Sequence, residues 1–183
     1  MKTITIDPTI YTTKPDGANR LPKEMDTYIF LDKLAIPYCR LDHDETASID
    51  VCHQVEKLLG ISICKNLFLG NSQATNFYLL MMPGHKRFKT KDLSKQINSS
   101  RLSFADAQYM ERYLNIKPGS VSILGLMNDQ DHRVKLLIDK EVLNDEYIGC
   151  HPCVNTASLK IQTSDLLTKF LPATGHVPRL VEL

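Results

Sequence analysis

The chain has 183 residues, of which 43% are hydrophobic and 23% are charged, so one domain can bury a core without disulfides or metals. Its formal net charge of +1 excludes a strongly basic nucleic-acid-binding protein but is compatible with a local basic patch. The longest apolar run, Phe77–Met82, is far too short to cross a membrane, and the first residues lack the apolar segment of a signal peptide. We therefore expect a cytoplasmic protein with no membrane partner.

The N-terminal region is weakly patterned. Residues 1–22 contain Thr, Pro and Gly without a hydrophobic period, which predicts an N-terminal arm in front of a domain that spans 23–183. A helical period of apolar residues follows, and Tyr38–Leu41 is then typical of a strand. Ser48 is a suitable N-cap for a helix that ends at Gly60.

The middle of the chain alternates strands with turns and short helices. Lys65–Leu69 and Phe77–Met82 are predicted strands, joined by a hairpin loop over 70–75. Ser103 resembles the first residue of a capping box, with Asp106 in place of the usual Glu or Gln, so a helix is expected to begin there.

The C-terminal part continues this alternation. Val121–Met127 and Val134–Ile138 are predicted strands. The elements expected after them are a short helix around Lys140–Leu143, a strand at Leu159–Ile161, a capped helix that ends at Leu171, and a strand at Arg179–Val181. Hairpin-linked strands mixed with helices predict a single compact α+β domain with a twisted mixed, mostly antiparallel sheet flanked by helices. No Gly-x-Gly-x-x-Gly or Walker loop is present, so no cofactor is expected.

The segment Gly149–Thr156 concentrates polar and turn-forming residues after an apolar run. Pro152 fixes a turn, and the side chain of Asn155 can support it through hydrogen bonds to the backbone. A rigid turn of this kind presents backbone groups to a ligand. For His151 the ordinary alternative is a hydrogen-bonded structural histidine.

Lys65 enters an apolar run beside Asn66. An ammonium group there needs a partner or a route to water, so Lys65 either extends along the strand edge to solvent or faces a phosphate or carboxylate. Neighbouring residues of a regular strand face opposite sides, so Lys65 and Asn66 share one pocket only at a strand end or bulge.

Other charged segments are less specific. Lys86, Arg87 and Lys89 surround one aromatic residue, and Arg101 lies just beyond them. They form either a solvated loop face or a patch that contacts the phosphates of a nucleic acid. The cluster at 42–45, which contains two Asp, one His and one Glu, is typical of a charged loop rather than a metal site.

The five cysteines fit reduced, buried thiols better than a disulfide framework, because their number is odd and they are scattered. Cys150 and Cys153 form the one Cys-x-x-Cys motif, which leaves a thiol-redox role open. A structural zinc site would need two further ligands at suitable spacing, so no metal is expected.

Five segments follow one another along the chain: Lys65–Leu69, Arg101–Ala105, Lys117–Val121, Gly125–Asp129 and Gly149–Thr156. Together and in this order, they resemble the YbaK-like editing domains associated with prolyl-tRNA synthetase. From about residue 23 to the C-terminus, the chain most resembles the free-standing alanyl-tRNA(Pro) deacylases. The resemblance implies a compact α+β fold and hydrolysis, in trans, of alanine wrongly esterified to tRNA(Pro). It also implies mischarged tRNA, held by its acceptor end, as a partner and prolyl-tRNA synthetase as a candidate partner.

The resemblance also assigns roles to residues. Lys65 matches the family's essential lysine, which lies near the terminal adenosine of the tRNA, and His151 matches the histidine that helps define the amino-acid pocket. Ile123 stands where the family has a proline, which leaves the local turn and the size limit of the pocket open. The further matches to the family's binding residues are Asn66, Gly149, Pro152 and Asn155.

The implied reaction needs no catalytic triad, because an aminoacyl ester is already activated and a modest reduction of the barrier suffices. Backbone N–H groups near Gly125 or Gly149 are expected to face the developing oxyanion. Leu67, Phe68 or Val154 is expected to wall a sieve that admits alanine and excludes proline.

Lys86, Arg87, Lys89 and Arg101 are the predicted contacts to tRNA. The sequence leaves three alternatives open. These are editing of another amino acid, such as cysteine or serine, binding of tRNA without catalysis, and a thiol-redox function.

Overall fold

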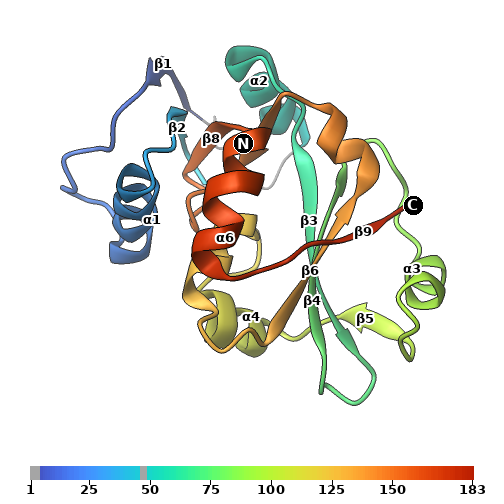
Figure 1. Ribbon diagram of the computed structural model, residues 1–183. Helices are drawn as coiled ribbons and strands as arrows, with labels where there is room; N and C mark the ends of the chain where they lie inside the picture. The colour runs from blue at the N-terminus through green and yellow to red at the C-terminus, as the bar shows by residue number, and fades with distance from the viewer. Residues whose placement is uncertain (1–4, 46–48) are drawn as a thin grey trace.

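Two β-sheets form the framework of the protein, and the computed structural model describes them over residues 5–45 and 49–183 (Figure 1). One sheet has the strand order β1-β2-β8-β7, and the other has the order β5-β3-β4-β6-β9. The strands are β1 (Ile6–Tyr11), β2 (Tyr38–His43), β3 (Cys64–Asn71), β4 (Phe77–Pro83), β5 (Leu102–Phe104), β6 (Val134–Asp139), β7 (Tyr147–Cys150), β8 (Ala157–Gln162) and β9 (Arg179–Val181).

Short helices connect and cover the two sheets. The α-helices are α1 (Pro22–Lys33), α2 (Ile49–Leu59), α3 (Thr90–Gln96), α4 (Ala107–Leu114), α5 (Thr163–Asp165) and α6 (Leu171–Thr174). The 3₁₀ helices are η1 (Ile123–Asn128) and η2 (Lys140–Asn144), and η3 (Leu166–Phe170) is a π-helix between α5 and α6. None of the helices in the described residues is long and apolar enough to span a bilayer.

Most strand pairs are antiparallel. The four-stranded sheet is antiparallel throughout, whereas in the five-stranded sheet β6 runs parallel to both β4 and β9. A single parallel bridge between Ile63 and Gly149 brings the start of β3 next to β7. The predicted α+β fold with mixed, mostly antiparallel strands is confirmed, although the strands are divided between two sheets instead of lying in one.

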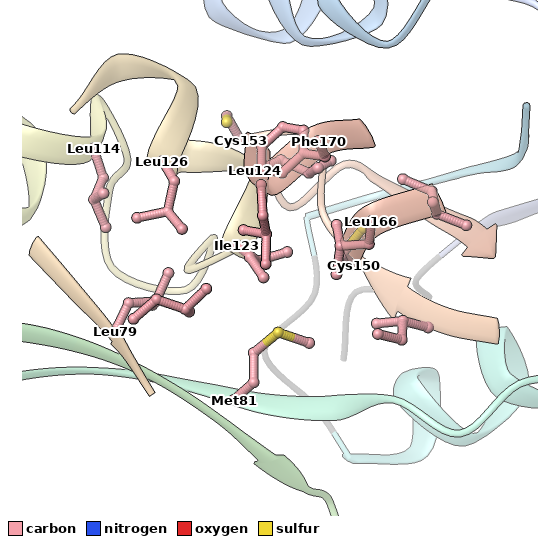
Figure 2. Packing of buried hydrophobic residues seen from close by; sticks show 14 of the residues in the cluster. Leu79, Met81, Leu114, Ile123, Leu124, Leu126, Cys150, Cys153, Leu166 and Phe170 are labelled. Atoms are coloured by element: carbon pink, nitrogen blue, oxygen red, sulfur yellow. The ribbon is translucent and has the colours of Figure 1, made fainter. Parts of the chain in front are cut away.

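The five-stranded sheet is buried on both faces at its centre. Every residue of β4 is buried. Because successive side chains of a strand point to opposite faces, Leu79 and Met81 join one hydrophobic cluster and Leu80 and Met82 join another. Figure 2 shows Leu79 and Met81 opposite η1 and the C-terminal helices. The larger cluster therefore fills the space between this sheet and the rest of the domain.

The first 22 residues contribute a strand to the domain. Ile10 of β1 pairs with Leu41 of β2. Farther along, the Arg20 guanidinium donates to the Asp42 carboxylate at 2.7 Å. The segment predicted to be a loosely packed arm is thus attached to the edge of the four-stranded sheet, beside α1 (Figure 1).

Two local predictions were wrong. Residues 121–127 contain no strand, and Ile123–Asn128 form the 3₁₀ helix η1. Ile123, Leu124 and Leu126 are buried there, and a short apolar run does not distinguish a strand from a buried helical turn. Ser103 lies in β5 and caps nothing. The N-cap of α4 is Asp106, whose carboxylate accepts from the Gln108 N–H at 3.0 Å.

The helix expected to be capped and to end at Leu171 has no side-chain cap and continues through η3 to Thr174. Other boundaries follow the sequence signals closely. The hairpin of β3 and β4 turns over 72–76, and β6 covers the predicted strand at Val134–Ile138. Gly60 follows the end of α2 with a φ of 62°, the left-handed conformation that favours glycine at a helix C-terminus. The predicted N-cap of that helix, Ser48, lies outside the described residues.

Candidate active site

A cavity of about 250 Å³ lies where the start of β3 meets the end of β7. Its volume is just below the roughly 300–1,000 Å³ of pockets that hold drug-sized ligands, so it suits a small chemical group. Three of the predicted site residues line it: Asn66, Gly149 and His151. The lining residues that the sequence did not single out for this purpose are Ile63, Cys64, Gly119, Val121, Cys150 and Ser158.

The His151 ring is held in one orientation by the backbone. Its Nδ1 lies 2.9 Å from the carbonyl oxygen of Ala157. Because a carbonyl only accepts, Nδ1 carries the proton and Nε2 of the neutral ring carries a lone pair. Burial lowers the pKa of His151, which keeps the ring neutral near pH 7. Nε2 has no hydrogen-bond partner among the described residues, so it is available to a ligand.

The turn around His151 is built by its neighbours. A Cβ on Gly149 would lie 2.5 Å from Cδ1 of Ile61, so the chain needs glycine at this close approach. Pro152 is buried, and the amide of Asn155 donates to the carboxylate of Glu45 at 3.4 Å. Neither residue lines the cavity, and the Asn155 side chain pairs with Glu45 instead of with the backbone of the turn, as the sequence had suggested.

Asn66 brings an unpaired acceptor to the cavity wall. Its Oδ1 is buried and has no hydrogen-bond partner in the part of the chain that the structure describes. Its Nδ2 makes only a long contact of 3.4 Å to the carbonyl of Cys64. Leaving a buried acceptor unpaired costs about 1–3 kcal/mol.

Lys65 faces a different hollow from that of Asn66. It lines a larger cleft of about 880 Å³, which adjoins the cavity through the shared walls Ile63 and Cys64. The exposed Lys65 ammonium donates to the carbonyl oxygen of Lys86 at 2.7 Å. Strand alternation thus sends the two neighbours into two adjoining spaces instead of one pocket.

Several residues expected near the pocket lie elsewhere. A Cβ on Gly125 would lie 2.4 Å from Cδ1 of Ile116, so this glycine allows close packing within the core. Phe68 is 2% exposed and belongs to the same core. Leu67 and Val154 are also absent from the cavity lining.

Only some of the cations in the predicted basic patch are available to a ligand. The Lys86 ammonium donates to both carboxylate oxygens of Asp139 at 3.0 Å and lies 2.9 Å from Glu141. Its hydrogen bond to Glu141 is the main reason that the pKa of Lys86 is raised. Lys86 is therefore committed to these carboxylates. The exposed cations of the patch are Arg87, Lys89 and Arg101.

Cys150 and Cys153 lie in the hydrophobic core, as Figure 2 shows. Burial raises the pKa of both thiols, that of Cys153 to about 11. A redox cysteine needs the opposite, a lowered pKa and an accessible thiolate. The surroundings of this Cys-x-x-Cys pair therefore favour inert, buried thiols.

One polar pair at the site was missed by the sequence analysis. His43, assigned there to a charged loop, is the buried last residue of β2, and its Nε2 lies 2.9 Å from the Ser158 Oγ on β8. The His43 and His151 rings are 6.3 Å apart, centroid to centroid. The alternation of Cys39, Leu41 and His43 along the strand was the one signal that placed His43 on an inward face.

A comparison with protein families decides which family the chain belongs to. The model of the aminoacyl-tRNA editing domain matches residues 43–169, which include the cavity residues from Ile63 to Ser158. The chain belongs to the aminoacyl-tRNA editing domain family. It is accordingly an aminoacyl-tRNA hydrolase, and the resemblance to YbaK-like editing domains is confirmed.

Individual relatives of this editing-family chain cover most of its length. The prolyl-tRNA editing protein ProX of Acetoanaerobium sticklandii is 30% identical over 153 residues, or 84% of this chain and 93% of that protein. The mouse prolyl-tRNA synthetase associated domain-containing protein 1 is 32% identical over 81% of this chain and 89% of its own length. A crystal structure described as a proposed trans-editing enzyme for prolyl-tRNA synthetase has the same fold, with a TM-score of 0.65 and 14% identity over 90% of this chain and 99% of that chain.

Proposed function

We propose that this protein hydrolyses alanine wrongly esterified to tRNA(Pro), acting in trans on tRNA that the synthetase has released. The observation that carries the proposal is the cavity itself, a space of about 250 Å³ that Asn66 and His151 both line and to which His151 brings a nitrogen free for a ligand. The names of the relatives, a prolyl-tRNA editing protein among them, support the choice of tRNA.

The two adjoining hollows suggest how the substrate lies. We place the aminoacyl group in the small cavity and the terminal adenosine in the larger cleft, with the ester bond near the shared walls Ile63 and Cys64. The Lys65 ammonium has three N–H donors and uses one on the Lys86 carbonyl. The other two are available for a phosphate or ribose oxygen of the nucleotide.

Positioning and a neutral base account for the chemistry. A water held by His151 Nε2 attacks the ester carbonyl carbon and gives its proton to that nitrogen. The bond to the ribose oxygen then breaks, and the departing oxygen takes up the proton that His151 Nε2 received. Backbone N–H groups of the turn at Gly149 are the candidates to stabilise the oxyanion. No residue in this scheme requires a metal or a cofactor.

Size provides the selectivity in this proposal. A synthetase pocket shaped for proline rejects the smaller alanine by only a few kcal/mol, so a second, smaller site is needed. The side chains of Ile63, Val121 and Cys150 wall the cavity, in place of the residues expected from the sequence. Cysteine and serine are the competing substrates, since both are close to alanine in size.

The rest of the tRNA requires a surface beyond the cavity. Arg87, Lys89 and Arg101 are exposed and remain the proposed contacts to phosphates of the acceptor end. Prolyl-tRNA synthetase, which produces the mischarged tRNA, is the proposed functional partner, and the cytoplasm is the proposed compartment.

A panel of mischarged tRNAs tests the proposal. We expect the purified protein to deacylate alanyl-tRNA(Pro) faster than the cysteinyl, seryl and prolyl esters. Lys65→Ala is expected to lower kcat/KM about tenfold, because one charge-assisted contact to the nucleotide is lost. Faster release of cysteine or serine would change the substrate but keep the activity. Tight binding of the tRNA without hydrolysis of any ester would contradict the proposed deacylase activity. Wild-type activity of Lys65→Ala would show that Lys65 does not make the proposed contact to the nucleotide.

A further inference from the structure

Ser158 brings a hydroxyl group to the cavity wall. It lies on β8 between Ala157 and Leu159, both of which are fully buried. Leu159 joins the main hydrophobic core, so Ser158 faces the other side of the strand, where it lines the same cavity as His151. The side chain is 3% exposed, and its oxygen is therefore shielded from bulk solvent.

His43 fixes the direction in which this hydroxyl donates. Its Nδ1 lies 2.9 Å from the carbonyl oxygen of Asp44, and its Nε2 lies 2.9 Å from the Ser158 Oγ. The carbonyl only accepts, so Nδ1 carries the proton and Nε2 is an acceptor in the neutral ring. The Ser158 hydroxyl must then donate its single proton to His43. Its oxygen is left with lone pairs and no proton to offer to the cavity.

The cavity wall thus presents acceptors and lacks an acidic group. Among the described residues, neither Asp nor Glu lines the cavity, while the Ser158 Oγ can accept. The Ser158 oxygen is also polarised, because hydrogen bonds in a chain strengthen one another. In an aminoacyl ester, the group next to the carbonyl that donates N–H bonds is the α-amino group.

We propose that Ser158, oriented by His43, accepts a hydrogen bond from the α-amino group of the bound aminoacyl ester. This assignment rests on the proposed function. It makes Ser158 a binding residue that recognises an amino acid as such, and His43 a positioning residue that acts through it.

A Ser–His pair is also the geometry of a nucleophile and its base. The backbone of Ser158 disfavours that role, because the residue pairs with Leu41 within the regular ladder of β2 and β8. Serine nucleophiles instead occupy sharp turns with free N–H groups for the oxyanion. The binding role needs only the oxygen that the pair already presents.

The test compares an ester that has the α-amino group with one that lacks it. kcat/KM is measured for alanyl-tRNA(Pro) and for propionyl-tRNA(Pro), and the ratio of the two is the readout. Ser158→Ala is expected to reduce this ratio about tenfold to a hundredfold, the effect of losing a hydrogen bond to a charged group. Ser158→Cys, which has nearly the same volume but a weak acceptor, is expected to reduce it similarly. Ser158→Thr keeps the hydroxyl and is expected to restore it.

Other results would overturn the assignment. An unchanged ratio in Ser158→Ala, whether or not both rates fall, would show that the hydroxyl does not recognise the amino group. An acylated Ser158, found by mass spectrometry of quenched reactions, would make it a nucleophile. His43→Ala is expected to lower the ratio by a smaller factor than Ser158→Ala, and a larger factor would also contradict the scheme. If the wild-type protein hydrolyses neither ester, it is the proposed function that fails.

Discussion

The two faces of β2 carry two polar clusters that differ in how completely their groups are paired. On one face, Arg40 and Asp42 form an ion pair, and Arg20 donates to the Asp42 carboxylate at 2.7 Å. Arg20 also pairs with Glu24 at 2.9 Å, and Glu24 accepts from the Tyr28 hydroxyl at 3.0 Å. Each of these charges has an opposite charge beside it, and the pKa of Arg20 is raised chiefly by its hydrogen bond to Asp42.

The other face leads to the cavity, where the pairing is incomplete. His43 is satisfied by Ser158 and by the backbone of Asp44, but Asn66 has an oxygen without a partner and His151 has a free nitrogen. A buried polar group without a partner lowers stability. The comparison agrees with our proposal, in which the paired cluster serves the fold and the incompletely paired cluster receives the ligand.

The largest expected effect comes from removing the free nitrogen. His151→Ala is expected to lower kcat for alanyl-tRNA(Pro) by about 10²–10⁴, the usual contribution of a general base. The unfolding midpoint should change little, since the ring makes one hydrogen bond to the backbone. His132→Ala, at an exposed histidine outside the cavity, is the matched control. A loss of stability as large as the loss of rate would make His151 a structural residue and erase the contrast between the two faces.

The paired cluster should respond in the opposite way. Glu24→Ala leaves Arg20 with only Asp42 and deprives Tyr28 of its acceptor. We expect the free energy of unfolding to fall by about 2 kcal/mol, as for other hydrogen bonds to charged groups. Denaturant titration measures this change, and kcat/KM at a temperature well below the unfolding midpoint should remain near that of the wild type. A strong loss of activity in folded protein would link this cluster to the site.

The smallest expected effect is the dependence of stability and of the enzymatic rate on pH, which should come from the two histidines at the cavity. Burial lowers the pKa of His43 and of His151 below the ordinary value of about 6.5. Between that value and the lower folded pKa, the unfolded chain binds more protons than the folded chain, so stability falls as the pH is lowered through this window. Protonation also removes the lone pair of His151 Nε2, so the enzymatic rate should fall in the same window.

Rates measured from pH 7.5 to 5, corrected for uncatalysed ester hydrolysis, test this dependence. In His151→Ala the remaining rate should no longer show the fall that protonation of the His151 ring causes in the wild type. Glu24→Ala should keep the pH profile of the wild type. A rate that stays constant down to pH 5 would mean that neither ring is needed in its neutral form.

Residues close together in the sequence were sufficient to predict several elements of the structure. The hairpin of β3 and β4 follows from two apolar runs around a polar loop, and the turn that comes after β7 follows from the proline and the polar residues over 151–156. Strand alternation alone was enough to predict that Lys65 and Asn66 face different sides, and the structure sends them into adjoining hollows. Such features depend on residues within a few positions of one another.

Only the tertiary structure decided which distant groups meet. Ser158 and His43 are 115 positions apart, and their hydrogen bond exists because β2 and β8 pair in one particular register. The buried apolar residues from Ile123 to Leu126 form part of the 3₁₀ helix η1 instead of a strand, and the carboxylates of Asp139 and Glu141 bind Lys86 and so remove it from the basic patch. Sequence patterns report the period of one element, whereas pairing between elements depends on register and packing across the whole chain.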